Sequence, residues 1–275
     1  LFDYQTTITL ETLGGAIFNN FNVVQVSSGG TSNINAGIVF NNAAGTLIDV
    51  QTGSTFRLDG GGSFTGAQTI NGTLVLDAGT FTLSDGSVFS GDLVLAGATM
   101  NLVGDFSLDT LNLQSGTINL NTGSTGGGDT LSFTTAFNWS GGASIIGNAN
   151  DTSILDIPAL ATMTLSGDIG GAQKRILDNV TVNNAGTFVY ASTNDDNLRL
   201  DNGTIFNNLA GAVFDYQTAS NIQTVGGATF NNFNELRISS GTTATFDAGV
   251  FLDNKTGTLI DVQGGSTLVL NGGGN

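Results

Sequence analysis

The sequence contains a copy of its own beginning. Residues 1–63 align without a gap onto residues 213–275, each residue matching the one numbered 212 higher, and 35 of the 63 aligned pairs are identical. The stretch Gly45–Gln51 returns unchanged as Gly257–Gln263. Self-similarity at a fixed period is typical of repeat proteins, in which each unit packs only against its neighbours. We therefore expect an elongated chain that represents about one and a third units of a tandem array.

The composition favours β-structure. The chain has 41 Gly and a single Pro, and Gly inside a helix costs about 1 kcal/mol relative to Ala, so long helices are unfavourable. Apolar residues alternate with polar ones in short stretches, which places pairs such as Leu74 and Leu76, or Phe81 and Leu83, on one side of a strand. Turn residues interrupt these stretches every 7 to 9 positions.

The charge pattern excludes several partners. The net charge is −16, and the six basic residues are scattered instead of forming a stripe that could neutralise phosphates. We therefore expect no nucleic-acid partner, and the acidic surface also disfavours docking on anionic membranes. No run of 18 apolar residues exists, so we expect no membrane insertion of this segment. The basic residues are Arg57, Lys174, Arg175, Arg199, Arg237 and Lys255.

A shorter period inside the chain indicates the architecture. Phe18–Asn20 and Phe40–Asn42 are 22 residues apart, and Phe206–Asn208 and Phe230–Asn232 are 24 apart, each with the sequence Phe-Asn-Asn. One such interval holds three strand-like stretches, so we predict an all-β fold: a single continuous parallel β-helix (β-solenoid) over residues 1–275, with three faces and about 22–25 residues per coil. The three stretches of the second coil are Ile38–Phe40, Thr46–Gln51 and Ser54–Asp59.

Stacked coils place equivalent residues about 4.8 Å apart along the axis. We therefore expect Phe18, Phe40, Phe206 and Phe230 to be buried in one or two interior stacks. The Asn pairs that follow these Phe residues should form ladders at one corner, because Asn bonds its own backbone and tolerates tight turns. The only Pro, Pro158, should lie at a turn or at the start of a strand.

Longer stretches resemble a known class of proteins. Phe137–Gly142, Ile157–Gly167 and Val182–Thr187 are similar to the long β-helical repeats of giant bacterial surface proteins, the filamentous haemagglutinins and autotransporter passengers. The resemblance covers nearly the whole chain and consists of composition and period. It implies secretion, display at the bacterial cell surface, and a role in adhesion, matrix or filament formation. The partners that it implies are neighbouring repeats of the same chain, self-association and surface glycans.

Parallel β-helices also include polysaccharide lyases, hydrolases and tailspike-like carbohydrate-binding proteins, and glycoside hydrolysis generally requires two carboxylates. The densest acidic stretch is Asn194-Asp195-Asp196-Asn197, followed by Arg199. It could form a catalytic or Ca²⁺-binding loop, but we interpret it as a polar turn with solvated carboxylates. The chain has no His, so imidazole contributes neither acid–base nor metal chemistry.

The most regular acidic feature is a set of four Asp that recur with the repeat, Asp3, Asp49, Asp215 and Asp261. Their neighbours are apolar or aromatic, so these Asp should point outward. Calcium bound between coils would be one use of such residues. The chain lacks the nonapeptide of calcium-filled β-rolls, however, so we expect a solvated face.

Two further residue types are candidates for binding. Trp139 could stack on a sugar ring, but a lone Trp in a β-rich chain is more often partly buried. Thr alternations such as Thr80–Thr82 and Thr162–Thr164 do not recur at one coil position in the predicted period, which disfavours a Thr ladder that binds ice. We therefore predict a structural or adhesive extracellular segment that is not an enzyme and has no catalytic, cofactor-binding or metal-binding residues. The alternative is a carbohydrate-binding or carbohydrate-cleaving β-helix.

Overall fold

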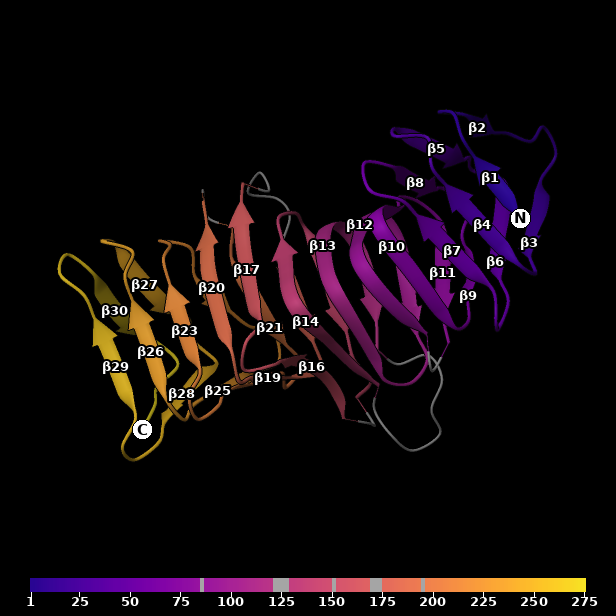
Figure 1. Ribbon diagram of the computed structural model, residues 1–275. Coiled ribbons are helices and arrows are strands. Elements are labelled where there is room, and N and C mark those ends of the chain that lie inside the picture. The colour runs from indigo at the N-terminus through magenta and orange to yellow at the C-terminus, as the bar shows by residue number, and fades with distance from the viewer. Residues whose placement is uncertain (85–86, 121–128, 150–151, 169–174, 194–195) are drawn as a thin grey trace.

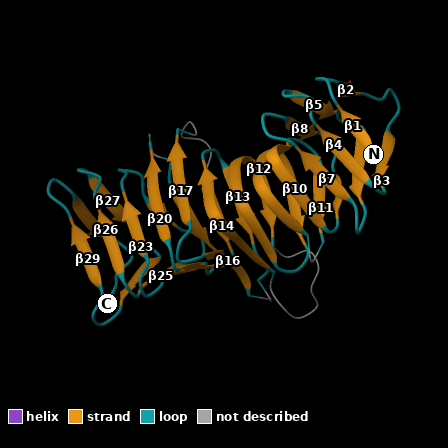
Figure 2. Ribbon diagram, viewed as in Figure 1, coloured by secondary structure: helices purple, strands orange, loops and turns teal. Residues whose placement is uncertain are grey.

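The chain winds into one elongated β-solenoid. The computed structural model describes residues 1–84, 87–120, 129–149, 152–168, 175–193 and 196–275. Within these residues every regular element is a β-strand, and the chain runs from one end of the stack to the other, so that the two termini lie far apart (Figure 1). Strands joined by turns and loops make up the whole of the described chain (Figure 2). None of the described residues belongs to a helix that could span a membrane. The predicted all-β parallel fold is confirmed.

Pairing between strands defines three faces. β1 (Phe2–Tyr4) pairs in parallel with β4 (Val23–Val26), and the next two strands of the first coil likewise pair with the strands three positions further on. One coil therefore comprises three strands. We call the three stacks of paired strands face 1, face 2 and face 3, in the order in which the chain visits them.

The middle coils contain long strands that turn the corners without interruption, so that β10, β12, β13 and β14 contribute to more than one face. Face 1 consists of β1, β4, β7 (Leu47–Val50), the first parts of β10 (Ala67–Leu76), β12 (Val88–Leu102), β13 (Phe106–Asn119) and β14 (Thr130–Trp139), then β16 (Ser153–Ile157), β19 (Val180–Asn184), β22 (Ile205–Asn208), β25 (Ala228–Asn232) and β28 (Val250–Asn254). Face 2 consists of β2 (Thr9–Leu10), β5 (Thr31–Ile34), β8 (Thr55–Leu58), further parts of β10, β12, β13 and β14, then β17 (Thr162–Gly167), β20 (Thr187–Ser192), β23 (Val213–Tyr216), β26 (Glu235–Ile238) and β29 (Leu259–Val262). Face 3 consists of β3 (Ala16–Asn20), β6 (Ile38–Asn42), β9 (Gly62–Phe64), β11 (Thr80–Leu83), the last parts of β12 and β13, then β15 (Ala143–Ile146), β18 (Arg175–Asp178), β21 (Leu198–Asp201), β24 (Ile222–Gln223), β27 (Thr243–Phe246) and β30 (Thr267–Leu270).

The length of a coil varies along the solenoid. Paired residues are 22 or 24 positions apart in both copies of the repeat, as Phe2↔Val24 and Thr31↔Thr55 illustrate. In the middle of the chain this separation falls to 18, as in Asn101↔Asn119. It later rises to its largest value, in the pair Ser144↔Ile176. The predicted period of 22–25 residues therefore holds for the two copies and for the coils that lead into the second copy, such as Arg175↔Leu198 and Val182↔Phe206, whereas the middle coils depart from it.

The short coils are possible because the backbone turns their corners through very few residues. Gly91 lies at such a corner with φ +96°, and a Cβ at this position would lie 1.6 Å from the carbonyl oxygen of Ile70. Only Gly can adopt this conformation at this distance from the neighbouring coil. The contraction of the middle coils therefore depends on particular glycines.

The core consists of inward side chains stacked from coil to coil. Phe40, Phe206 and Phe230 are fully buried, and Phe18 is partly buried because it belongs to the first coil. Phe18 stacks on Phe40 on face 3 with centroids 5.4 Å apart, and Phe206 stacks on Phe230 on face 1 at 4.8 Å. The predicted Phe stacks are thus confirmed, as two stacks on two faces. Pro158 lies in the turn after β16, where its carbonyl accepts a hydrogen bond from Ala161 N–H, as predicted.

Candidate functional site: polar networks duplicated in both copies of the repeat

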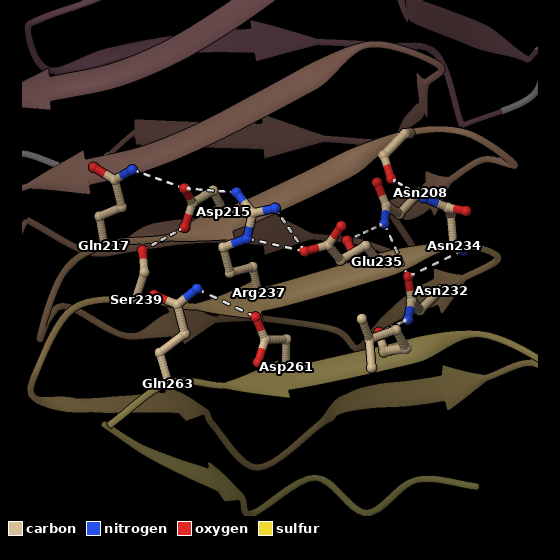
Figure 3. A network of polar contacts seen from close by, with 12 residues as sticks. Asn208, Asp215, Gln217, Asn232, Asn234, Glu235, Arg237, Ser239, Asp261 and Gln263 are labelled. Atoms are coloured by element: carbon tan, nitrogen blue, oxygen red, sulfur yellow. Dashed lines mark hydrogen bonds and ion pairs between the residues drawn. The ribbon is translucent and has the colours of Figure 1, made fainter. Parts of the chain in front are cut away.

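A buried ladder of amide side chains follows one corner of the solenoid. The side chain of Asn208 is buried, and its Nδ2 donates to Asn232 Oδ1 at 2.8 Å and to the backbone carbonyl of Glu235 at 2.8 Å. Its Oδ1 accepts from Asn184 Nδ2 at 2.9 Å, and Asn232 donates onward to Asn254 at 2.8 Å. One amide hydrogen thus extends the ladder and the other closes the corner (Figure 3). We call this set the inner Asn ladder.

The first copy of the repeat contains the same ladder. Asn20 donates to Asn42 Oδ1 at 2.6 Å and to the carbonyl of Leu47 at 3.1 Å. Asn42 then donates to Gln68 Oε1 at 3.2 Å. The other Asn of each pair faces outward and forms a parallel outer ladder. The predicted Asn ladders are thus confirmed, but they lie at two corners instead of one, at the end of face 3 in the first copy and of face 1 in the second. The outer contacts are Asn41 to Asn19 at 3.0 Å, Asn207 to Asn183 at 2.9 Å and Asn231 to Asn207 at 2.9 Å.

An outward carboxylate network lies beside this ladder in the second copy. Asp215 accepts hydrogen bonds from Ser239 Oγ at 2.6 Å and from Gln217 Nε2 at 2.8 Å, and the guanidinium of Arg237 lies 3.8 Å from it. Arg237 also forms an ion pair with Glu235 at 2.7 Å (Figure 3). These neighbours cover Asp215 so completely that it is only 9% exposed. The predicted solvated face is therefore wrong for Asp215, because side chains of its own and the next coil replace water around the carboxylate.

The first copy repeats this network with two substitutions, because Gln25 and Val23 occupy the positions of Arg237 and Glu235. Asp3 accepts from Gln5 Nε2 and from Ser27 Oγ, both at 2.9 Å. Gln25 occupies the position of Arg237 and donates to Asp49 Oδ2 at 2.8 Å. The repeated Asp and its amide and hydroxyl partners thus recur in both copies, whereas the Arg237–Glu235 ion pair does not.

The four repeated Asp occupy two columns of paired residues. Asp3 and Asp49 lie two coils apart with Gln25 between them, and Asp215 and Asp261 lie two coils apart with Arg237 between them. A hydrogen-bond donor therefore separates the carboxylates within each column. No group of three or more His, Cys, Asp or Glu in the described residues is arranged to hold a metal ion.

The acidic stretch in the third quarter of the chain differs from its prediction. Asn194 and Asp195 lie outside the described residues, and Asp196 is fully buried instead of solvated. The phenol of Tyr190 forms two hydrogen bonds with the backbone here. It accepts from Leu198 N–H at 2.9 Å and donates to the carbonyl oxygen of Asp196 at 3.0 Å. Asp196 therefore lies beside Tyr190 of face 2, out of contact with water.

A buried cation near this turn was not predicted. The guanidinium of Arg175 is fully buried and donates to the hydroxyl of Ser192 and to the carbonyl of Ser166. Burial lowers the pKa of Arg175, and the charge of Asp196 acts in the opposite direction. The signal was present in the alternation, since Arg175 and Leu177 share one side of β18 and Leu177 faces the core. Arg199 on the outer side forms an ion pair with Asp201.

Trp139 and the Thr residues also have definite positions. Trp139 is fully buried and stacks on Phe137 with centroids 6.1 Å apart, so it packs the core and is not accessible to a sugar. The expectation that Thr does not recur at one coil position is wrong. Six Thr share one outward column of face 2, interrupted by Asp92 and Ala136. A fixed period misses this column because the coils that separate its members differ in length. The six are Thr31, Thr55, Thr73, Thr110, Thr162 and Thr187.

A surface groove with a volume of about 510 Å³ lies after face 3 near the C-terminal end. Its polar lining combines a guanidinium, a carboxylate and two amides, and Asn221 Nδ2 donates to the carboxylate of Asp247 at 3.3 Å. Several corresponding positions of the first copy carry different residues, since Gln223, Asp247 and Asn271 are replaced by Glu11, Asn35 and Asp59, so the polar lining of the groove differs between the copies. Its lining residues are Arg199, Gln223, Thr224, Val225, Asp247, Ala248 and Asn271.

Comparison with family models, curated proteins and solved structures gives no match for this chain.

Proposed function

We propose that this chain is a rigid, non-catalytic segment of an extracellular fibre, stalk or filament in a large repetitive bacterial surface protein, with adhesion as its wider role. The observation that carries the proposal is the register of the two copies. Phe2 pairs with Val24 in the first copy, and the equivalent residues Phe214 and Leu236 pair in the second. The pairs that follow in each copy are equivalent as well. A repeat that preserves its coils in this way extends one stack instead of forming a separate domain.

The side-chain networks support a mechanical role. The inner Asn ladder and the Phe stacks link each coil to the next through the interior, and the backbone hydrogen bonds run in the same direction, along the axis. The groups with the most regular repetition are thus engaged with one another. The partners that fit this role are neighbouring repeats of the same chain and further copies of the fibre.

The test is the location of the segment in the producing bacterium. Antibodies raised against the purified chain should label filaments outside intact cells in immunogold electron microscopy. External protease should remove that label without lysing the cells. Label found only inside the cells would contradict the proposal.

Carbohydrate binding remains the second candidate, and the groove beside Arg199 favours it. Planar guanidinium, carboxylate and amide groups can each pair with two neighbouring hydroxyls. If the groove binds glycans, Asp247→Ala should abolish binding of the chain to immobilised polysaccharides, whereas the matched change Asn35→Ala in the first copy should not. Release of reducing ends from a bound polysaccharide would indicate cleavage, and its loss in Asp247→Asn would assign the carboxylate of the groove.

A further inference from the structure

We propose that one unit of the tandem repeat turns the surface of the solenoid by about one third of a turn, so that successive units present the repeated Asp with its Gln and Ser partners on successive faces. The evidence is the course of the chain between the two copies. β1, which contains Asp3, belongs to face 1, whereas its counterpart β23, which contains Asp215, belongs to face 2. Equivalent residues therefore lie on different sides of the solenoid.

The rotation follows from counting coils along one face. From β1, face 1 continues through β4, β7, β10, β12, β13, β14, β16 and β19 to β22, which is nine steps of one coil each. β23 is the next strand of the chain after β22 and lies on face 2. One unit therefore contains nine complete turns and one additional strand, and that strand moves the second copy to the next face.

The remaining strands of the copy move in the same sense. The inner Asn ladder that starts at Asn20 lies at the end of face 3, whereas its counterpart at Asn232 lies at the end of face 1. Thr31 on face 2 corresponds to Thr243 on face 3. The shift therefore applies to the whole copy and is not a local distortion around Asp215.

The solenoid can accommodate this rotation because its faces share the same pattern of inward apolar and outward polar side chains. The stacks Phe18–Phe40 and Phe206–Phe230 make the same contact on face 3 and on face 1, at 5.4 Å and 4.8 Å. Each face alternates inward apolar with outward polar residues, so a strand keeps its buried side when it changes face. The lengths of the coils between the two copies then determine how many strands one unit contains. The number of strands in turn sets the angle of rotation between the copies.

The rotation determines in which directions around a fibre the network would be available to partners. In an array of such units, which rests on the proposed function, the carboxylate network would point in three directions in turn and return to the same side with every third unit. A partner that recognises the network would then be held all around the fibre. A partner that follows a single face of the solenoid would then meet this network only once in every three units. The surface therefore fits partners that surround the fibre, such as a mesh of further fibres.

The absence of Cys makes the angle measurable, because introduced Cys residues can be labelled specifically. One variant carries Thr31→Cys and Thr243→Cys, which change equivalent exposed residues of the two copies. Its control carries Thr31→Cys and Glu235→Cys. Glu235 lies in the same coil as Thr243, but in the same column of face 2 as Thr31. Any gradual twist of the solenoid affects both pairs equally.

Each variant is biotinylated, saturated with monovalent streptavidin and imaged as single particles by electron microscopy. We expect the angle between the two labels, viewed along the axis, to differ between variant and control by about one third of a turn, since the solenoid has three faces. Equal angles would overturn the proposal. A second pair, Thr55→Cys with Thr267→Cys against Thr55→Cys with Leu259→Cys, gives an independent measurement if a variant of the first set fails to fold.

The outcome is separate from that of the proposed function. The labels are placed on the isolated chain, so equal angles would contradict the proposed rotation without contradicting the proposed location at the cell surface. Conversely, a chain found only inside the cell would contradict the proposed fibre, whereas the rotation between the two copies would still hold.

Discussion

At the scale of single residues, the structure depends on buried polar groups that satisfy one another. An amide in the interior is costly unless both its donor and its acceptor are bonded. Asn208 and Asn232 meet this condition, because each accepts from the preceding Asn and donates once along the axis and once to a backbone carbonyl at the corner. Asn is suited to this position because its short side chain carries both groups close to the backbone.

Replacement of one Asn of the inner Asn ladder should therefore lower the stability of the fold. In Asn208→Ala, the donor of Asn184 and the carbonyl of Glu235 lose their partner, and each group left unpaired costs about 1–3 kcal/mol. The matched control Asn207→Ala alters the neighbouring outer ladder, where water can replace the lost contact, and should cost less than about 1 kcal/mol. Chemical denaturation measures both values. Equal losses of stability would contradict this account of the ladder.

The buried Tyr residues predict a loss of stability at high pH. Burial raises the pKa of Tyr4 from 10.0 to about 12, and it raises the pKa values of Tyr190 and Tyr216 still further. The unfolded chain therefore releases its phenolic protons at a lower pH than the folded chain does. Stability should be complete below pH 10 and should fall as the pH rises from 10 toward 12.

Melting temperatures across the alkaline range, together with tyrosinate absorbance, measure this effect. Tyr216→Phe should reduce the slope of stability against pH, whatever its effect at neutral pH. Tyrosinate formation below pH 10 in the folded chain would contradict the burial argument.

The same residues show what the sequence allowed us to predict. The Phe stacks and Asn ladders follow from a repeated triplet, because a fixed spacing in a solenoid becomes a column. Arg175 and Asp196 do not belong to a repeated triplet, so the period does not place them, although the alternation of β18 puts Arg175 on the same side as Leu177. The Thr column of face 2 escaped prediction because the coils between its members differ in length.

At the scale of elements, the corners control the size of a coil. Three strands of four or five residues account for only part of a coil, so the number of residues at the corners sets whether the separation is 18, 22 or 24. Strand positions followed from alternation, and the three stretches predicted for the second coil coincide with β6, β7 and β8. Corner lengths did not follow, because a turn contracts through close backbone contacts between coils, which no local pattern reveals.

A pair of Gly substitutions tests the role of the corners. Gly91 and Gly53 both have positive φ, but a Cβ at Gly91 would lie 1.6 Å from the carbonyl oxygen of Ile70, whereas Gly53 has no heavy atom within 4 Å of that position. We expect Gly53→Ala to cost about 1 kcal/mol through backbone strain alone. Gly91→Ala should cost about 2–4 kcal/mol, because the neighbouring coil must also move. Equal costs in thermal or chemical unfolding would show that the corner is not held by the contact with Ile70.

At the scale of the whole molecule, the chain is one stack without a division between domains. Its long axis is built from stacked coils, and Arg237 lies beside Glu235 of its own coil and Asp215 of the preceding coil. Gln25 and Arg237 occupy the positions between the repeated carboxylates. Stability should therefore come from stacking and not from bound ions.

Removal of metal ions checks this expectation. Addition of a strong chelator should leave the melting temperature of the purified chain unchanged, with Phe230→Ala as the comparison, since a lost core ring costs about 3–5 kcal/mol. A large fall in melting temperature with chelator, reversed by added calcium, would show that the Asp columns hold ions.

The most direct test of the account is the structure of the native assembly, determined by cryo-electron microscopy of filaments taken from the cell surface. Stacked coils predict density layers about 4.8 Å apart along the filament. At nine and a third turns per unit, each unit should rise by about 45 Å and rotate by about one third of a turn beyond the gradual twist of the coils. Filaments made of separate compact domains, or a unit that returns to the same face, would contradict it.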